Sequence, residues 1–365
     1  MPVEFIGMIG TRAGSELDGP AVSILGGHVD PEYVSRFARA HEEGGFDKVL
    51  IGYGSTGPDG FAVAGYVAGV TERLGFLVAH RPGFVAPTLA ARKAATLDQF
   101  TGGRISLHFI TGGNDAEQQR DGDWLDKDTR YRRTDEYLTI LRHIWTETTP
   151  LDFDGEFYHV KGGFSEVKPR QQPHIPIYFG GASGPALTVG AKHSDVYMLW
   201  GEPLAWVRER IAEVREAARP FENKPRFSVS VRPILGATED KAWERAHNIL
   251  NRIREVRGAG ALGAGKTPAS AGSQRLLEAA ARGEILDKRL WTPIAAATGA
   301  SGNTTALVGT PEQVAESLVD YYEAGATTIL IRGFNPLEDA IEYGRDLIPL
   351  VHAEVARRER SAVAV

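Results

Sequence analysis

Residues 175–183 read Ile-Pro-Ile-Tyr-Phe-Gly-Gly-Ala-Ser, and a helical pattern begins directly afterwards at Pro185. An apolar run that ends in glycine and leads into a helix is typical of a strand–helix unit in a parallel sheet. The glycines let backbone N–H groups approach a phosphate, and the N-terminus of the helix favours its negative charge. A plain strand-to-helix turn has the same pattern, so both interpretations stay open from these residues alone.

The same alternation of apolar runs and amphipathic stretches continues on both sides of this unit. Strands are expected at 3–9, 48–51, 74–79, 104–110, 175–179, 196–199, 226–235 and 327–331. Helices are expected at 31–43, 58–70, 87–100, 130–146, from 185, and at 204–217, 239–256 and 311–324. Eight strands with intervening helices predict an α/β fold of the (β/α)8 TIM-barrel type. The alternative is a doubly wound sheet, which accommodates two inserted segments less readily.

Two segments interrupt the alternation. Residues 151–160 alternate apolar and polar residues around Asp154-Gly155, which predicts a hairpin inserted at about 150–165. Residues 258–305 belong to no strand–helix unit, and glycines at both ends predict a mobile flap over the barrel mouth. With both segments as insertions, residues 1–365 are expected to form a single domain.

The predicted flap contains a sequence that matches a nucleotide-binding pattern. Residues 260–267 read Gly-Ala-Leu-Gly-Ala-Gly-Lys-Thr, which fits the phosphate-binding loop G-x-x-x-x-G-K-[ST]. That loop requires a buried strand before it and a helix directly after it. Here a charged helical stretch precedes the pattern and Pro268 follows it, so we interpret the segment as part of the flap.

Composition excludes several classes of function. The chain has 41 Lys and Arg against 47 Asp and Glu, a net charge of −6 with interspersed signs, unlike the basic patch of a nucleic-acid binder. It has no cysteine, which excludes disulfides, thiolate metal sites and cysteine nucleophiles. No apolar run has the roughly 20 residues of a membrane span, and no leader is visible. We therefore expect a cytoplasmic enzyme.

The ten histidines lack the spacing of metal ligands, so no metal is expected. We place four of them at the surface or at an interface: His108, His143, His193 and His247. Other side chains at strand ends are candidates for the barrel mouth. These are His80, Trp200, Arg232, Arg332 and Phe334, together with residues 109–115 (Phe-Ile-Thr-Gly-Gly-Asn-Asp). Several arginines near one mouth suggest an anionic ligand, although arginines at strand ends also serve as structural ion-pair partners.

Taken together, several stretches resemble one family over about residues 5–350. They are Arg81-Pro82, residues 87–98 (Pro-Thr-Leu-Ala-Ala-Arg-Lys-Ala-Ala-Thr-Leu-Asp), Arg130-Tyr131, and residues 178–183, 199–203 (Leu-Trp-Gly-Glu-Pro) and 305–309 (Thr-Ala-Leu-Val-Gly). The chain is similar to the FMNH2-dependent alkanesulfonate monooxygenases of the bacterial-luciferase-like barrel group. Each stretch is short, but the combination is specific to this group.

The resemblance implies that reduced FMN binds across the barrel mouth. The residues that would hold its phosphate are Tyr131, Gly181, Ala182 and Ser183. Asn114 stands where the family has an aspartate near the isoalloxazine ring. Trp200 would line the substrate pocket, and residues 258–305 correspond to the family's mobile loop.

The chain departs from the family at several positions. The family's cysteine falls near Gly57, and its seventh-strand arginine and histidine fall at Ser230 and Arg232. Phe334 replaces a tyrosine, and Arg12 aligns with a histidine. Arg332 is an added cation, and the family's flap arginine has no counterpart. The substrate is therefore expected to differ from a simple alkanesulfonate, with a hydroxylated sulfonate such as sulfoquinovose as one refinement.

The resemblance implies a two-component, FMNH2-dependent monooxygenase that cleaves the C–S bond of an organosulfonate to sulfite and an aldehyde. An NAD(P)H-dependent flavin reductase would supply the flavin, and a homo-oligomer is expected. Arg232 would pair with the sulfonate, with Arg12, Arg332 and Phe334 nearby, and His80 is the candidate proton acceptor. Three alternatives remain: a luciferase-like enzyme for a non-sulfonate, an F420-dependent oxidoreductase on the same barrel, and a non-enzymatic flavin binder.

Overall fold

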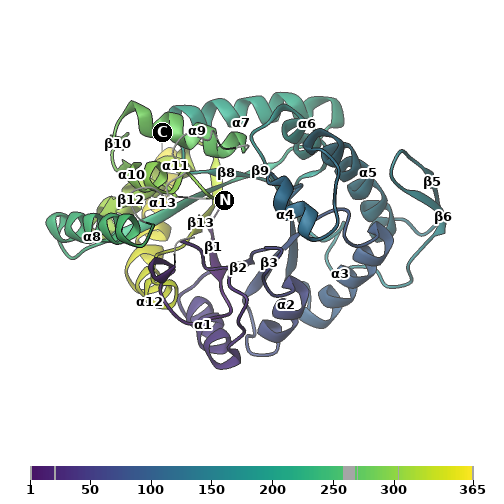
Figure 1. The fold of residues 1–365 in the computed structure, drawn as a ribbon, viewed down its shortest axis with the longest axis horizontal. Helices are drawn as coiled ribbons and strands as arrows, with labels where there is room; N and C mark the ends of the chain where they lie inside the picture. The colour runs from purple at the N-terminus through teal and green to yellow at the C-terminus, as the bar shows by residue number, and fades with distance from the viewer. Residues whose placement is uncertain (1, 20–21, 258–267, 269, 303, 364–365) are drawn as a thin grey trace.

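The protein folds around a closed barrel of eight parallel strands (Figure 1). The computed structural model describes residues 2–19, 22–257, 268, 270–302 and 304–363. The barrel strands are β1 (Glu4–Ile9), β2 (Lys48–Ile51), β3 (Gly75–His80), β4 (Ile105–Phe109), β7 (Ile177–Gly180), β8 (Val196–Trp200), β9 (Arg226–Leu235) and β13 (Ala326–Ile331). Each pairs in parallel with the next, and β13 pairs with β1 to close the barrel. The predicted (β/α)8 barrel is confirmed.

Helices surround the barrel on its outer side (Figure 1). Those at predicted positions are α1 (Pro31–Glu43), α2 (Gly60–Ala68), α3 (Pro87–Thr101), α5 (Lys127–Thr146), α6 (Gly184–His193), α7 (Leu204–Ala218), α8 (Glu239–Arg257) and α11 (Pro311–Glu323). Side-chain caps fix several of their starts. Asp30 accepts from the backbone N–H of Tyr33, and Thr310 forms a capping box with Gln313.

Alternation along the strands separates two apolar layers. In β4, Leu107 and Phe109 are fully buried against the helices, in the main core. A second cluster fills the inside of the barrel and consists of Ile6, Leu77, Tyr178, Val196 and Leu330, with Leu50 and Met198 packed against it. Because successive side chains of a strand point to opposite faces, the residues between the outward-facing ones point to the barrel interior. The inner cluster forms the floor on which the cavity described below rests.

Several elements lie outside the regular alternation. At the position of the predicted hairpin, β5 (Leu151–Asp154) and β6 (His159–Gly163) pair in antiparallel fashion. Elements that the sequence analysis did not anticipate are α4 (Asp115–Arg120), α12 (Pro336–Glu342), a π-helix (Tyr343–Leu347) and α13 (Ile348–Val363). No helix among the described residues is long and apolar enough to cross a membrane.

The predicted flap is in part a folded extension of the sheet. Residues 258–267 and 269, with the sequence that fits the phosphate-binding loop, lie outside the described residues. The remainder contains α9 (Ala271–Arg282), β10 (Ile285–Leu286), β11 (Leu290–Trp291) and α10 (Pro293–Thr298). β11 pairs with β12 (Ala306–Gly309), which in turn runs parallel to the second half of β9. The sheet extends here because β9 is ten residues long and continues past the barrel.

Three histidines inside the structure make its stability sensitive to acid. Burial lowers the pKa of His41, His80 and His108 from 6.5 to about 4. Between these values the unfolded chain binds protons that the folded chain does not, so the free energy of unfolding decreases as the pH falls from 6.5 to 4. Each ring contributes up to about 3 kcal/mol of this loss.

We therefore expect the melting temperature to fall steadily as the pH is lowered through this window. In the variant His41→Gln the decline should be less steep, because one of the three rings no longer titrates. A melting curve that does not change between neutral pH and the pKa of the buried rings would contradict this account.

Candidate active site

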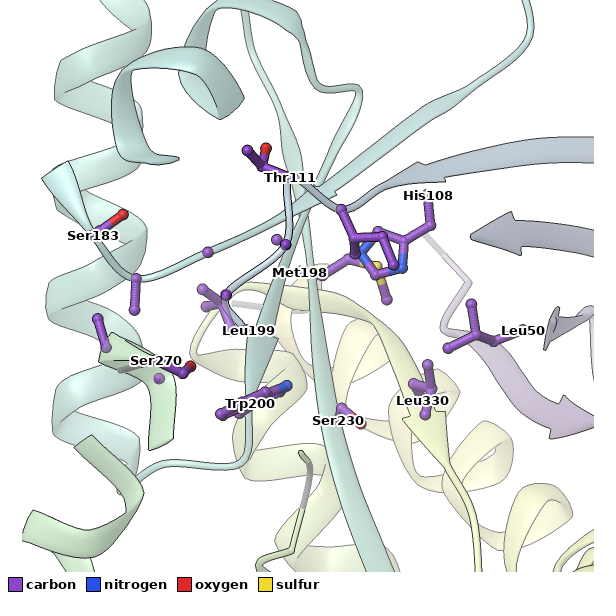
Figure 2. Close-up of a pocket in the computed structure, with 18 of the residues that line it drawn as sticks. Leu50, His108, Thr111, Ser183, Met198, Leu199, Trp200, Ser230, Ser270 and Leu330 are labelled. Carbon is purple, nitrogen blue, oxygen red and sulfur yellow. The ribbon is translucent and has the colours of Figure 1, made fainter. Parts of the chain in front are cut away.

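A cavity of about 380 Å³ lies at the carboxyl ends of the barrel strands (Figure 2). Figure 2 shows Ser183 and Ser270 at one end of it and Leu50 and Leu330 at the other. We call the first the α6 end, because Ser183 is the residue that precedes α6, and the second the barrel end. The carboxyl ends of barrel strands are where this fold carries its functional residues. The cavity is therefore the candidate active site.

The α6 end brings together the four residues predicted to hold a phosphate, Tyr131, Gly181, Ala182 and Ser183. The turn between β7 and α6 is tight, because a Cβ at Gly181 would lie 2.5 Å from the Cβ of Ala186 and 3.3 Å from the hydroxyl oxygen of Tyr131. Glycine thus allows the end of β7, α6 and Tyr131 to approach this closely, and the turn itself lines the cavity. Burial raises the pKa of Tyr131, so its phenol stays a neutral hydrogen-bond donor.

Two donors at the α6 end, the hydroxyl of Ser183 and the ammonium of Lys127, have no partner among the described residues. Ser183 precedes α6 but its side chain makes no capping hydrogen bond, and its Oγ is buried without a hydrogen-bond partner among the described residues. Lys127 lies one helical turn before Tyr131 on α5, lines the same cavity, and forms no ion pair with the described residues. An ammonium, a hydroxyl and the start of a helix together provide the donors that a phosphate requires.

Apolar side chains predominate at the barrel end, and His108, Ser230 and Arg332 lie among them. Met8, Leu50 and Leu330 line it together with His108, whose side chain points into the cavity (Figure 2). Nε2 of His108 is buried and has no hydrogen-bond partner among the described residues. Because burial lowers its pKa to about 4, the imidazole is neutral at ordinary pH.

The prediction that His108 lies at the surface or at an interface is wrong. The signal that identifies its position is the alternation within β4. Leu107 and Phe109 face the helices, so the side chain between them faces the barrel interior. A polar residue at such a position, near the carboxyl end of a strand, is a candidate for the site.

His80 faces the opposite way from the position expected for a catalytic residue. It lies on the same face of β3 as Phe76 and Val78, whose side chains pack against the helices. Its Nε2 forms a 2.7 Å hydrogen bond with the hydroxyl of Tyr137 on α5. His80 does not line the cavity at the barrel end, and it borders a second, more polar cavity of about 550 Å³ on the β2–β3 side. His80 is therefore at the carboxyl end of β3 but outside the candidate active-site cavity.

Arg232 and Phe334 also lie behind the cavity wall rather than in it. Arg232 is fully buried, and its guanidinium carbon lies 3.7 Å from the centroid of the Phe334 ring, which is itself buried. Its Nη2 is 2.8 Å from Oε2 of Glu16, and Oε1 of Glu16 is 2.7 Å from Nη1 of Arg332. Of the predicted arginines, Arg332 lines the cavity. Glu16, the first residue of the short 3-10 helix Glu16–Asp18 after β1, pairs with Arg232 behind the cavity wall.

Of the other three predicted residues, one lines the cavity and two do not. Arg12 is exposed, does not line the cavity, and packs so closely on Gly26 that a Cβ there would lie 2.6 Å from its Nε. Asn114 does not line the cavity, and its side chain accepts from the backbone N–H of Glu117 and caps α4. Trp200 does line it.

Trp200 marks the place where α9 covers the cavity. A Cβ at Gly272 would lie 2.7 Å from the Trp200 ring, and Ser270 and Gly272 line the cavity beside it. Glu202 holds α9 there, because both of its carboxylate oxygens accept hydrogen bonds from Arg275. Within the residues that the structure describes, no group of three or more acidic or histidine side chains is arranged to hold a metal ion.

Comparison with known proteins gives the class that this fold and cavity define. Residues 3–328 match the luciferase-like monooxygenase family, and the chain therefore belongs to that family. The predicted membership of the luciferase-like group is thereby confirmed.

Three solved structures share the fold. Riboflavin lyase (RcaE) has a TM-score of 0.78 at 17% sequence identity, covering 99% of this chain and 92% of that chain. EDTA monooxygenase from Chelativorans sp. BNC1 has a TM-score of 0.72 at 19% identity, covering 97% and 94%. An F420-dependent secondary alcohol dehydrogenase has a TM-score of 0.68 at 17% identity, covering 96% and 99%. At such identities the likeness extends to the fold alone.

Proposed function

We propose that the protein is a two-component monooxygenase that uses reduced FMN supplied by a separate NAD(P)H-dependent flavin reductase. The observation that carries this proposal is the set of unpartnered donors at the α6 end, where Ser183 Oγ and Lys127 have no partner among the described residues. FMN carries one terminal phosphate and a flat apolar ring system. The cavity offers phosphate donors at one end and apolar side chains at the other, which fits that molecule.

When bound, reduced FMN reacts with O2 and supplies the oxygen atom that a monooxygenase transfers. The protein contributes the surroundings of this reaction. Met8, Leu50 and Leu330 exclude water from the barrel end. Glu202 and Arg275 hold α9 over the opening beside Trp200.

We further propose that His108 moves a proton in the reaction, in place of His80. Its Nε2 is buried without a partner and its ring lines the cavity, whereas His80 is bonded to Tyr137 and does not line the cavity. An anionic ligand beside the ring favours the charged imidazolium and raises its pKa toward the range in which a general base works.

The proposed substrate is an organosulfonate, following the resemblance in sequence. A substrate R–CH2–SO3⁻ with FMNH2 and O2 would give R–CHO, sulfite, FMN and water. In this balance O2 is the oxidant, the C–S bond breaks, and the carbon loses one proton to a base. A hydroxylated sulfonate such as sulfoquinovose remains one proposed refinement.

The experiment that tests this substrate is a sulfite assay. The enzyme is given FMNH2, O2 and a panel of simple and hydroxylated sulfonates, and sulfite is measured. We expect sulfite from at least one member of the panel. Oxygenated products from sulfones or amines, with no sulfite from any sulfonate, would overturn the sulfonate but leave the monooxygenase.

The glycine turn at the α6 end gives a second test, which concerns the flavin. In the variant Gly181→Ala, the new methyl group must displace Ala186 or the turn itself, so FMN affinity should fall by about tenfold or more. Gly184→Ala is a matched control at the first residue of α6, because a Cβ there meets nothing within 4 Å. Equal FMN affinities for the two variants in a fluorescence titration would show that the turn does not hold the phosphate.

A further inference from the structure

Two guanidinium groups share one buried carboxylate beside the barrel end of the cavity. Arg232 and Glu16 have side chains that are 0% and 1% exposed, and that of Arg332 is 12% exposed. Glu16 contacts Arg232 with one oxygen and Arg332 with the other. The cluster of Arg232, Glu16 and Arg332 therefore has two positive charges and one negative charge, a net charge of one positive unit.

No further carboxylate among the described residues pairs directly with this cluster. The next carboxylates, Asp339 and Glu342, are both bonded to Arg245, at 2.6 Å and 2.8 Å. Asp339 also accepts hydrogen bonds from the backbone N–H groups of Phe334 and Asn335. Nε and Nη1 of Arg232 are buried with no hydrogen-bond partner among the described residues. Desolvation and the charge of Arg332 lower the pKa of Arg232 to about 10, as expected for a guanidinium in a positively charged setting.

The surplus charge reaches the cavity through Arg332. This residue lines the barrel end with Ser230, whose backbone is in register with Leu330 two residues before Arg332. The carboxylate that lines the cavity is Glu202, and both of its oxygens are already bonded to Arg275. Within the described residues, no acidic group in the cavity is therefore available to neutralise Arg332 further.

We propose that Arg332 and Ser230 form the subsite for the head group of the substrate. This head group is a singly charged oxyanion. Glu16 sets the preference of the subsite for one negative charge over two. This inference rests on the proposed function for the role of the ligand as substrate. Glu16 cancels one of the two guanidinium charges, so one negative charge on the ligand completes the balance. Glu16 is thus a specificity-determining residue that acts through Arg332.

Binding measurements test the subsite without turnover. Propane-1-sulfonate carries one charge, and propyl phosphate carries two at mildly alkaline pH. Each is titrated calorimetrically into the enzyme saturated with oxidised FMN, so that the α6 end is occupied. We expect Arg332→Gln to weaken propane-1-sulfonate binding by about tenfold or more and to leave FMN affinity unchanged. The matched control is Arg12→Gln, which removes an exposed arginine outside the cavity and should change neither value.

Glu16 is tested by changing the charge balance. Glu16→Gln leaves two uncompensated guanidiniums and should shift the preference toward propyl phosphate by about tenfold. The double variant Glu16→Gln/Arg232→Met restores a single surplus charge and should restore the preference for the sulfonate. If Glu16→Gln does not fold, Arg232→Met in the wild-type background takes its place. It leaves Arg332 fully balanced by Glu16, so propane-1-sulfonate binding should weaken by about tenfold, and unchanged binding would overturn the charge balance.

Two outcomes overturn the inference: unchanged sulfonate binding in Arg332→Gln, or a charge preference that is the same in the wild type and the folded Glu16 variant. Failure of the proposed function is separate. In that case these binding shifts are seen, but no sulfonate yields sulfite. Binding of butanoate as tight as that of propane-1-sulfonate would identify the class as singly charged oxyanions in general rather than sulfonates.

Discussion

The variant His108→Asn is expected to turn over about 100-fold to 10,000-fold more slowly than the wild type, with little change in FMN affinity. Asparagine keeps a polar side chain of similar reach but cannot carry a proton between its two states. His108 lines the cavity with Nε2 unpartnered, so the loss should fall on kcat rather than on cofactor binding. The measurement is steady-state turnover combined with an FMN titration.

The control for this variant is His159→Asn, which removes an exposed histidine of the β5–β6 hairpin. It should leave turnover unchanged. A pH profile adds a readout that a merely structural role would not move, since the limb caused by a titrating base should be absent in His108→Asn. Turnover within a few-fold of the wild type, with the same pH profile, would exclude His108 from proton transfer.

The second large effect is expected at the α6 end. In Lys127→Gln, FMN affinity should fall by about 10-fold to 100-fold, because a hydrogen bond to a charged group contributes about 1.5–3 kcal/mol. Riboflavin lacks the phosphate, so its affinity should stay the same. Lys161→Gln, an exposed lysine on β6, is the control. Equal losses for FMN and riboflavin would mean that Lys127 does not contact the phosphate.

Much of the fold follows from periodicity and caps. The eight barrel strands lie where short apolar runs occur, and β2 and β9 have the predicted bounds. β12 was missed because its four residues pair with the end of β9, a contact that no local pattern indicates. α13 is a different case, because its apolar residues Ile348, Val351 and Val355 recur at helical spacing and pack in the main core, a local signal like that of the other helices.

The site was predicted best where its signal is local. The glycine turn at residues 180–183 has a local pattern, and Tyr131 was added by the resemblance to the family. Both lie at one end of the cavity, and their binding of FMN stays a prediction. His108 also has a local signal, because it lies between Leu107 and Phe109 in β4 and its side chain must therefore point to the barrel interior. Arg232 could not be placed correctly from sequence, because its partner Glu16 lies more than two hundred residues away along the chain.

The central claim is that reduced FMN, rather than the deazaflavin F420, drives an oxygenation in this cavity. The most direct measurement is an anaerobic titration with FMNH2 and, separately, with reduced F420, followed by mixing with isotopically labelled O2 and the sulfonate panel. We expect saturable binding of FMNH2, no binding of reduced F420, and one labelled oxygen atom in the alcohol obtained when the aldehyde product is reduced at once with borohydride, before its carbonyl oxygen exchanges with water. Binding of reduced F420 alone, with hydride transfer to a substrate and no label in any product, would contradict the account.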